Sequence, residues 1–146
     1  MHIASILDRA AQLWPDREAV VSGDIRLNYA RFAERARALA AALRGAGLEL
    51  GNRVTIVRPN GHVFLEAYFA AAYAGLVLVP INTRLTGREV ALILRDSGAR
   101  LVLAHEDHRS LVEEALAGDL PALPRVIWSS DAQLDEYWRD HDKRVH

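Results

Sequence analysis

The chain has 146 residues, of which 51% are hydrophobic, and its formal net charge at pH 7 is −1. This length suits one compact α/β domain, and the near-neutral charge argues against a protein that binds nucleic acid or a membrane surface, since either normally carries a basic excess. Because the sequence contains no cysteine, it excludes a disulfide framework, a thiol nucleophile and a cysteine-ligated zinc site.

The first residues are expected to form a helix followed by a hairpin. Apolar residues recur at helical spacing before Pro15, where the helix should end. The apolar stripe of this helix consists of Ile3, Ile6, Leu7, Ala10 and Leu13. Two strand-like runs, residues 18–21 and 25–27, then flank a Ser-Gly-Asp turn and predict a small β-hairpin.

A longer helix is predicted next, with Asn28 as its N-cap and its end at Gly45 or Gly47. Its apolar stripe consists of Phe32, Ala36, Leu39 and Leu43. We expect the remaining side of the helix to face solvent, because it carries Arg31, Glu34, Arg35 and Arg44.

The middle of the chain alternates between strand-like and helix-like segments. The predicted strands are residues 53–57, 76–81, 101–104 and 125–128. The predicted helices are residues 63–74, 86–97 and 108–117. Such alternation is typical of right-handed βαβ crossovers, so we predict an α/β fold with a mainly parallel sheet, flanking helices and the N-terminal hairpin.

Two of these helices have distinctive sequences. Thr86 and Glu89 form the pattern of a capping box at the start of helix 86–97, whose core face would be Val90, Ile93 and Leu94. Helix 63–74 carries a single charge, Glu66, and is apolar on all other sides. A helix of this kind needs cover on more than one side, which predicts that the chain self-associates as a homo-oligomer.

The sequence also bears on domain boundaries and location. We expect residues 1–128 to form the α/β portion and residues 129–146 a charged tail, in which Leu134, Tyr137 and Trp138 could anchor a short helix. The longest uncharged stretch, residues 67–83, is too short and too interrupted to span a membrane. Residues 1–13 contain charges where a signal peptide would be apolar, so a cytoplasmic location is expected.

Two motifs that suggest chemistry have simpler explanations. Gly45, Gly47 and Gly51 resemble a dinucleotide-binding loop, but their spacing is one residue too long and they follow a helix, so helix termination explains them better. His105 and His108 are three residues apart, whereas zincins place their histidines four apart on a helix. A solvated loop whose acids favour the next helix N-terminus is the preferred interpretation, and we predict no metal site.

The most informative segment for function is the run from residue 79 to residue 86. It follows a predicted strand, at the end where open α/β sheets bind their ligands. Asn82 and Arg84 are the first polar residues after an apolar run, and an arginine there can hold a phosphate or carboxylate. From the residues alone, a structural ion pair or a loop hydrogen bond is the favoured explanation of Arg84.

Several motifs, in order and spacing, resemble the adenylate-forming acyl-CoA synthetases. They are PDREAV at 15–20, LNY at 27–29, GNRV at 51–54, RPN at 58–60, AG at 74–75, PINTRL at 80–85 and DSGA at 96–99. The resemblance spans roughly residues 3–104. It implies that the chain is an incomplete N-terminal portion of the large domain of such an enzyme.

The resemblance also implies a reaction for the parent enzyme. A carboxylic acid reacts with ATP and Mg²⁺ to give an acyl-adenylate and pyrophosphate, and CoA then displaces AMP to form a thioester; fatty acid metabolism is the setting that the resemblance implies. In CoA-forming members the arginine matching Arg84 can contact the nucleotide phosphates of CoA. No residues here match the family's phosphate-binding loop, acyl pocket or catalytic lysine. We therefore expect that this chain by itself binds none of ATP, Mg²⁺ and CoA as a cofactor. We also expect it to contain no catalytic residue.

Two other interpretations stay open. The same fold piece could act alone, as a dimer, in the role of a non-catalytic binding or assembly module. A small flavodoxin-like nucleotide binder is weaker, because no phosphate loop follows the first strand. The gene sequence beyond His146 would separate the ligase from the module.

Overall fold

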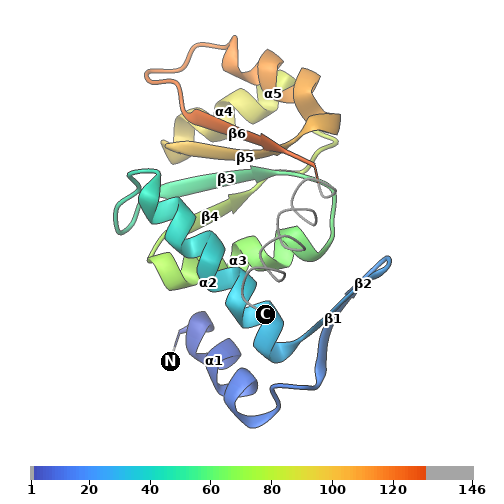
Figure 1. The fold of residues 1–146 in the computed structure, drawn as a ribbon. Helices are drawn as coiled ribbons and strands as arrows, with labels where there is room; N and C mark the ends of the chain where they lie inside the picture. The colour runs from blue at the N-terminus through green and yellow to red at the C-terminus, as the bar shows by residue number, and fades with distance from the viewer. Residues whose placement is uncertain (1, 131–146) are drawn as a thin grey trace. The chain divides into compact units, whose positions relative to one another are not determined.

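The computed structural model describes residues 2–130 and divides the chain into two compact units. Unit 1 comprises Met1–Val54 and Asn60–Val79, and unit 2 comprises Thr55–Pro59 and the residues from Pro80 onward. The predicted α/β class with an N-terminal hairpin is confirmed (Figure 1). The expected boundary between a domain at 1–128 and a tail at 129–146 stays a prediction, and the expected helix around Leu134 lies outside the described residues.

Unit 1 consists of a hairpin packed with three helices. Its elements are α1 (Ile3–Leu13), β1 (Glu18–Ser22), β2 (Ile25–Asn28), α2 (Tyr29–Gly45) and α3 (His62–Ala74). The strands β1 and β2 pair antiparallel around Gly23, whose φ of 58° suits glycine in the turn. Asn28 caps α2 as predicted, because its Oδ1 accepts a hydrogen bond from the Arg31 amide at 2.8 Å.

The core of unit 1 lies where α1, α2 and the hairpin meet. It contains Leu7, Val20, Leu27, Phe32, Ala33 and Ala36. The rings of Phe32 and Phe69 meet edge to face, with centroids 5.4 Å apart, which joins α2 to α3.

The structure corrects two predictions about which side chains unit 1 buries. Ile3, Ile6 and Leu13 are about half exposed, so only part of the expected stripe of α1 packs into the core. Arg35 was expected to face solvent but is 4% exposed, because α3 places Glu66 against it. Helical spacing alone cannot identify a buried cation whose partner lies on another helix.

Unit 2 contains the carboxyl-terminal strands and helices. Its elements are α4 (Gly87–Ser97), β5 (Leu101–His105), a 3₁₀ turn (Glu106–His108), α5 (Arg109–Leu116) and β6 (Arg125–Ser129). The strands β5 and β6 pair in parallel, and α4 and α5 both lie on one side of them (Figure 1). The buried core is Val57, Ile81, Val90, Leu94, Ala99, Val102, Ala104, Val112 and Ala115.

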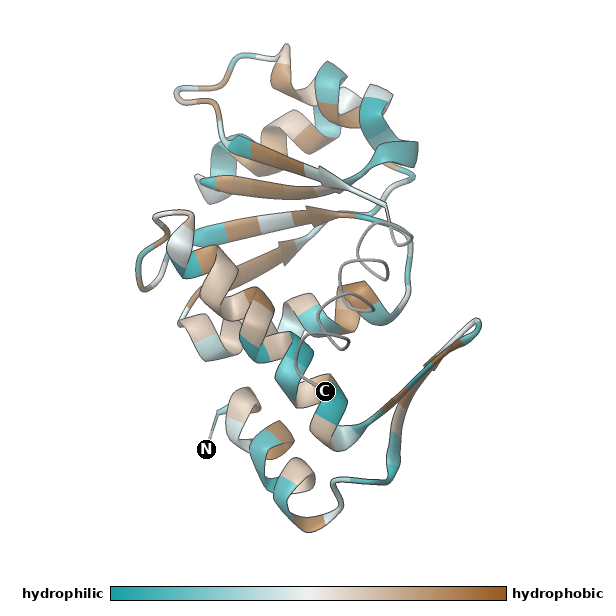
Figure 2. Cartoon of the chain, viewed as in Figure 1, coloured by the Kyte–Doolittle hydropathy of each residue, from teal (hydrophilic) through white to brown (hydrophobic). Residues whose placement is uncertain are grey.

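The main sheet has four strands. They lie in the order β4–β3–β5–β6, where β3 is Arg53–Val57 and β4 is Val77–Pro80. In Figure 2 these strands are mostly brown, which indicates apolar side chains. The two inner strands, β3 and β5, are almost wholly buried, as is typical of strands with near-continuous apolar sequences, whereas β4 and β6 are partly exposed. Among the described residues, no helix has both the length and the apolar character needed to cross a membrane.

Candidate functional site

The loop that follows β4 is a tightly hydrogen-bonded turn. The Ile81 amide donates to the Ile56 carbonyl at 3.0 Å, which extends the pairing with β3 by one residue. The side-chain oxygen of Asn82 then accepts from the Arg84 amide at 3.0 Å, and the Asn82 carbonyl accepts from the Leu85 amide at 3.1 Å. Asn82 therefore serves the geometry of the turn, and its side-chain oxygen is already engaged.

The N-terminus of α4 holds the other end of this turn. The predicted capping box is confirmed, because the Thr86 hydroxyl accepts from the Glu89 amide at 3.2 Å and the Glu89 carboxylate accepts from the Thr86 amide at 2.8 Å. The exposed Arg84 stands between the two anchored ends. Within residues 2–130, its guanidinium makes no ion pair or side-chain hydrogen bond. The backbone at Arg84 is thus fixed while its charged group faces solvent.

A second arginine lies at the carboxyl end of β3. Arg58 is 3% exposed, and its Nη1 donates to the Ser129 hydroxyl at 2.9 Å and to the Ser129 carbonyl at 3.3 Å. Ser129 ends β6 and pairs in register with His105, the last residue of β5. The carboxyl ends of these strands therefore meet at one edge of unit 2, where open α/β sheets bind ligands. Arg58 was not predicted as a site residue, although a cation directly after an apolar strand was a usable signal.

The segment from His105 to Arg109 forms a network of its own. His105 Nδ1 accepts a hydrogen bond from the Asp107 amide at 3.0 Å, and Glu106 pairs with Arg109 at 2.8 Å. The Arg109 guanidinium also lies 4.1 Å from the centre of the Trp128 ring, and the hydrogen bonds that it donates to the Glu106 carboxylate raise the pKa of Arg109. Within residues 2–130, no three potential metal ligands come together. These contacts fit the interpretation of an acidic loop that precedes α5.

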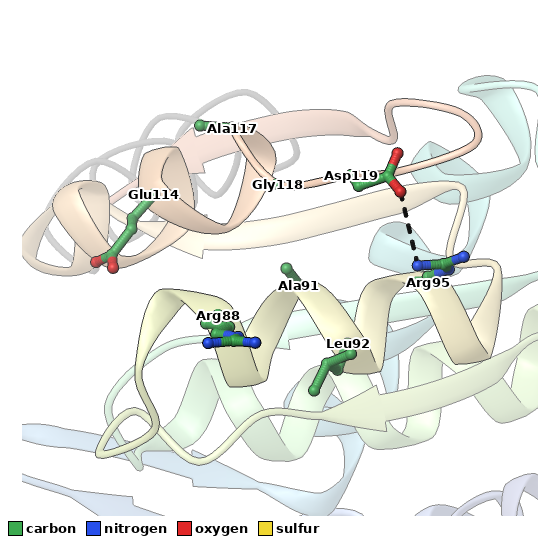
Figure 3. A pocket seen from close by; sticks show the side chains of 8 residues that line it. All are labelled: Arg88, Ala91, Leu92, Arg95, Glu114, Ala117, Gly118 and Asp119. Carbon is green, nitrogen blue, oxygen red and sulfur yellow. Dashed lines mark ion pairs between the residues drawn. The ribbon is translucent and has the colours of Figure 1, made fainter.

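A shallow groove of about 460 Å³ lies between α4 and α5 (Figure 3). Arg88 and Arg95 line it from α4, on either side of Leu92, and Glu114 lines it from α5. Arg95 pairs with Asp119 across it at 3.8 Å, with both side chains largely exposed. Because its charges of both signs are exposed to water, this groove is a solvated surface rather than a site that concentrates one kind of ligand.

The edge of unit 2 at which the strands have their carboxyl ends can bind an anion. Arg84 presents an exposed guanidinium on a fixed turn, and such a group holds phosphate or carboxylate oxygens through charge-assisted hydrogen bonds. Arg58 and His105, by contrast, are already bonded to the backbone or side chains of this edge. The geometry thus leaves the Arg84 guanidinium available to contact a phosphate or a carboxylate.

The comparisons with known proteins agree on one family. The model of the AMP-binding enzyme family matches residues 7–145. A feruloyl-CoA synthase from Amycolatopsis is 39% identical over 116 residues, and a CoA ligase from Rhodococcus jostii that acts on a methyl-dioxo-octahydroindenyl propanoyl group is 37% identical over 137. The solved structure of a Mycobacterium tuberculosis fatty acyl CoA synthetase superposes with a TM-score of 0.84 at 33% identity.

The matches cover most of this chain but little of its relatives. They span 80% of this chain and 24% of the Amycolatopsis protein, 89% and 27% for the Rhodococcus protein, and 94% and 28% for the Mycobacterium structure. The chain therefore spans about a quarter of the length of the relatives that it matches.

Proposed function

The chain belongs to the AMP-binding enzyme family, and from this premise we propose that it forms the N-terminal part of the large domain of an acyl-CoA synthetase. The observation that supports the proposal most strongly is the family match along residues 7–145, together with a fold shared with CoA ligases. The complete enzyme would join a carboxylic acid to CoA through an acyl-adenylate. In the first step the carboxylate would attack the α-phosphorus of ATP and pyrophosphate would leave. In the second step the CoA thiol would attack the acyl carbon of the acyl-adenylate and AMP would leave.

The contribution of this chain to that reaction would be structural support and one phosphate contact. Arg84 is the proposed contact, to a phosphate of CoA, because its charge is exposed on a turn fixed at both ends. ATP and Mg²⁺ would bind to other parts of the complete enzyme, which have no counterpart in this chain. By itself, the chain is proposed to be inactive.

For the acid that the complete enzyme activates, we propose a chemical class and no individual compound. The names of these relatives give a feruloyl group, a ring-bearing propanoyl group and a fatty acyl group, so the class proposed is a carboxylic acid. We propose fatty acid metabolism as the setting because of the likeness to the mycobacterial structure. The cytoplasmic location is part of the same proposal, and cell fractionation of the native host would test it.

A chimera tests the proposal directly. In the Amycolatopsis feruloyl-CoA synthase, the segment that matches this chain would be replaced by the chain itself, and feruloyl-CoA formation would be followed by absorbance. We expect the chimera to release pyrophosphate and form the thioester, because the family's remaining parts come from the host. A chimera that folds and binds ATP but forms no adenylate would contradict the proposal.

A further inference from the structure

The last strand of unit 2 is an edge strand with little burial. In the order β4–β3–β5–β6, β6 pairs with β5 on one side, and no other strand of the described residues pairs with its second side. Its residues are exposed or partly exposed, whereas β5 is almost wholly buried. An edge strand of this kind opens more readily than an inner strand. Contacts to its side chains therefore matter more for β6 than for β5.

Two arginines from other elements contact the last two residues of β6. The guanidinium of Arg109, at the start of α5, lies 4.1 Å from the centre of the Trp128 ring. The guanidinium of Arg58, directly after β3, donates through Nη1 to the hydroxyl and the carbonyl of Ser129, at 2.9 and 3.3 Å. Both contacts lie at the carboxyl end of β6, where the chain leaves the sheet.

Arg58 reaches Ser129 from two strands away. Because β5 lies between β3 and β6 (Figure 1) and neighbouring strands are about 4.8 Å apart, the Arg58 side chain crosses the carboxyl end of β5. The last residue of β5, His105, pairs in register with Ser129. Arg58 thus joins the carboxyl ends of three adjacent strands. We call its side chain, with the two hydrogen bonds to Ser129, the Arg58 strap.

The burial of Arg58 makes this contact hard to give up. Arg58 is 3% exposed, and a guanidinium removed from water is stable only while its N–H groups are hydrogen-bonded. An exposed arginine could exchange Ser129 for water at little cost, but a buried one has no water to turn to. The Arg58 strap therefore holds the end of β6 more firmly than a surface contact would.

The strap lies at the edge where open α/β sheets bind their ligands, outside the carboxyl ends of the strands. The chain that leaves Ser129 stays within the family match, which extends to residue 145. The end of β6 decides where this following segment starts. A group that holds Ser129 therefore places a part of the complete enzyme without itself contacting a substrate.

We propose that Arg58 is a positioning residue, which holds the carboxyl end of β6 from across β5 and so fixes where the chain leaves the ligand-binding edge of unit 2. The effect of the strap on the reaction rests on the proposed function, whereas its hold on β6 does not. Two experiments separate these claims.

Hydrogen exchange of the 146-residue chain, followed by mass spectrometry, tests the hold on β6. Arg58→Gln should speed exchange of the amides of residues 126–129 about tenfold, because the edge strand then opens more often. Ser129→Ala keeps the arginine and removes one acceptor, so it should speed exchange in the same residues by a smaller factor. Circular dichroism would verify that both variants fold.

Two matched controls make the same chemical changes elsewhere in unit 2. Arg100→Gln alters an exposed arginine just before β5, and Ser110→Ala alters an exposed serine of α5. Both controls should exchange like the parent chain. Parent-like exchange of residues 126–129 in folded Ser129→Ala and Arg58→Gln would overturn the proposal, and so would equal acceleration by the controls.

The chimera with the Amycolatopsis enzyme tests the effect on the reaction. Arg58→Gln should lower kcat for thioester formation about tenfold and leave KM for CoA nearly unchanged, because Arg58 places other groups and does not touch CoA. Arg58→Lys keeps the charge and a donor, so it should recover most of the loss. Parent-like kcat in Arg58→Gln would overturn the positioning role. An inactive parent chimera would contradict the proposed function instead, and the exchange rates would still decide on the strap.

Discussion

The guanidinium Nε of Arg35 lies 2.8 Å from the carboxylate of Glu66, and both side chains are at most 5% exposed. Two charges removed from water are stable only together, since each alone would keep its full desolvation cost. The pair joins α2 to α3 inside unit 1 and fixes how these helices face each other. An ion pair of the same length, Arg26 with Glu18 at 2.8 Å, joins the two hairpin strands, and its side chains are 66% and 51% exposed.

We predict that Glu66→Ala lowers the free energy of unfolding by about 3–5 kcal/mol, because it leaves Arg35 charged and buried. The control Glu18→Ala removes an ion pair of equal length that is exposed, and should cost at most about 1 kcal/mol. Urea unfolding measures both changes. Replacing both partners by apolar residues, Arg35→Met with Glu66→Leu, should recover most of the loss, and equal effects of Glu66→Ala and Glu18→Ala would contradict this account.

We predict that Arg84 contributes to the binding of CoA and not to the stability of the fold. In the chimera, Arg84→Ala should raise KM for CoA about tenfold, which corresponds to about 1.4 kcal/mol, while kcat stays nearly unchanged. Arg88→Ala is the control, because Arg88 is an exposed arginine four residues later that faces the α4–α5 groove. If both variants keep the parent KM, Arg84 has no role in binding CoA and serves only the turn.

At the scale of elements, one polar cluster ties three helices of unit 1 together. Asp8 of α1 accepts hydrogen bonds from the Tyr73 hydroxyl of α3, at 2.6 Å, and from the Arg37 guanidinium of α2. The bond from Tyr73, followed by that from Arg37, lowers the pKa of Asp8 below its usual 3.8. Burial, with the bond to Asp8, raises the pKa of Tyr73 to about 12, so its hydroxyl stays a donor at neutral pH.

The stabilising effect of Asp8 should depend on pH in a definite direction. Because folding lowers its pKa, the carboxylate contributes stability above the unfolded value of 3.8, and this contribution is lost as the pH falls through the lower folded value. Asp8→Asn should therefore be less stable than the parent at neutral pH, by at most about 1 kcal/mol since the pair is exposed, and equal to it in strong acid. Urea unfolding at several pH values measures the difference; a difference that grows toward acid would contradict the prediction.

At the scale of the whole molecule, the chain has the fold of an AMP-binding enzyme over about a quarter of its relatives' length. The described residues supply an anchored arginine, a buried arginine at a strand end and a histidine whose Nδ1 is already engaged. General acid–base or nucleophilic catalysis needs a group that is poised and accessible, and these residues do not form such a pair.

We therefore predict that the purified 146-residue chain releases no pyrophosphate from ATP and Mg²⁺ with ferulate or a fatty acid. A coupled pyrophosphate assay measures this, with the Amycolatopsis enzyme as positive control and the chimera as the matched test. Turnover by the chain alone would show that this sequence contains an adenylation site of its own.

The fold was predictable largely because its signals are local. Alternating apolar runs gave the strands and helices of the main sheet to within one or two residues, and Asn28 and Thr86 marked helix starts through hydrogen bonds to amides three residues away. Of the site, Arg84 was predictable because its polarity contrasts with the apolar strand before it. Its role as a CoA contact stays a prediction.

The sequence by itself determined the order of elements, the family motifs and the lack of thiol chemistry. Only the tertiary structure decided that Arg35 is buried, that Arg58 bonds to Ser129 seventy-one residues away, and that Val21 lies beside the exposed face of α3. The physical reason is the range of the interactions. Helix caps and strand periodicity depend on neighbours in sequence, whereas burial of a charge or exposure of an apolar face depends on what distant segments bring against it.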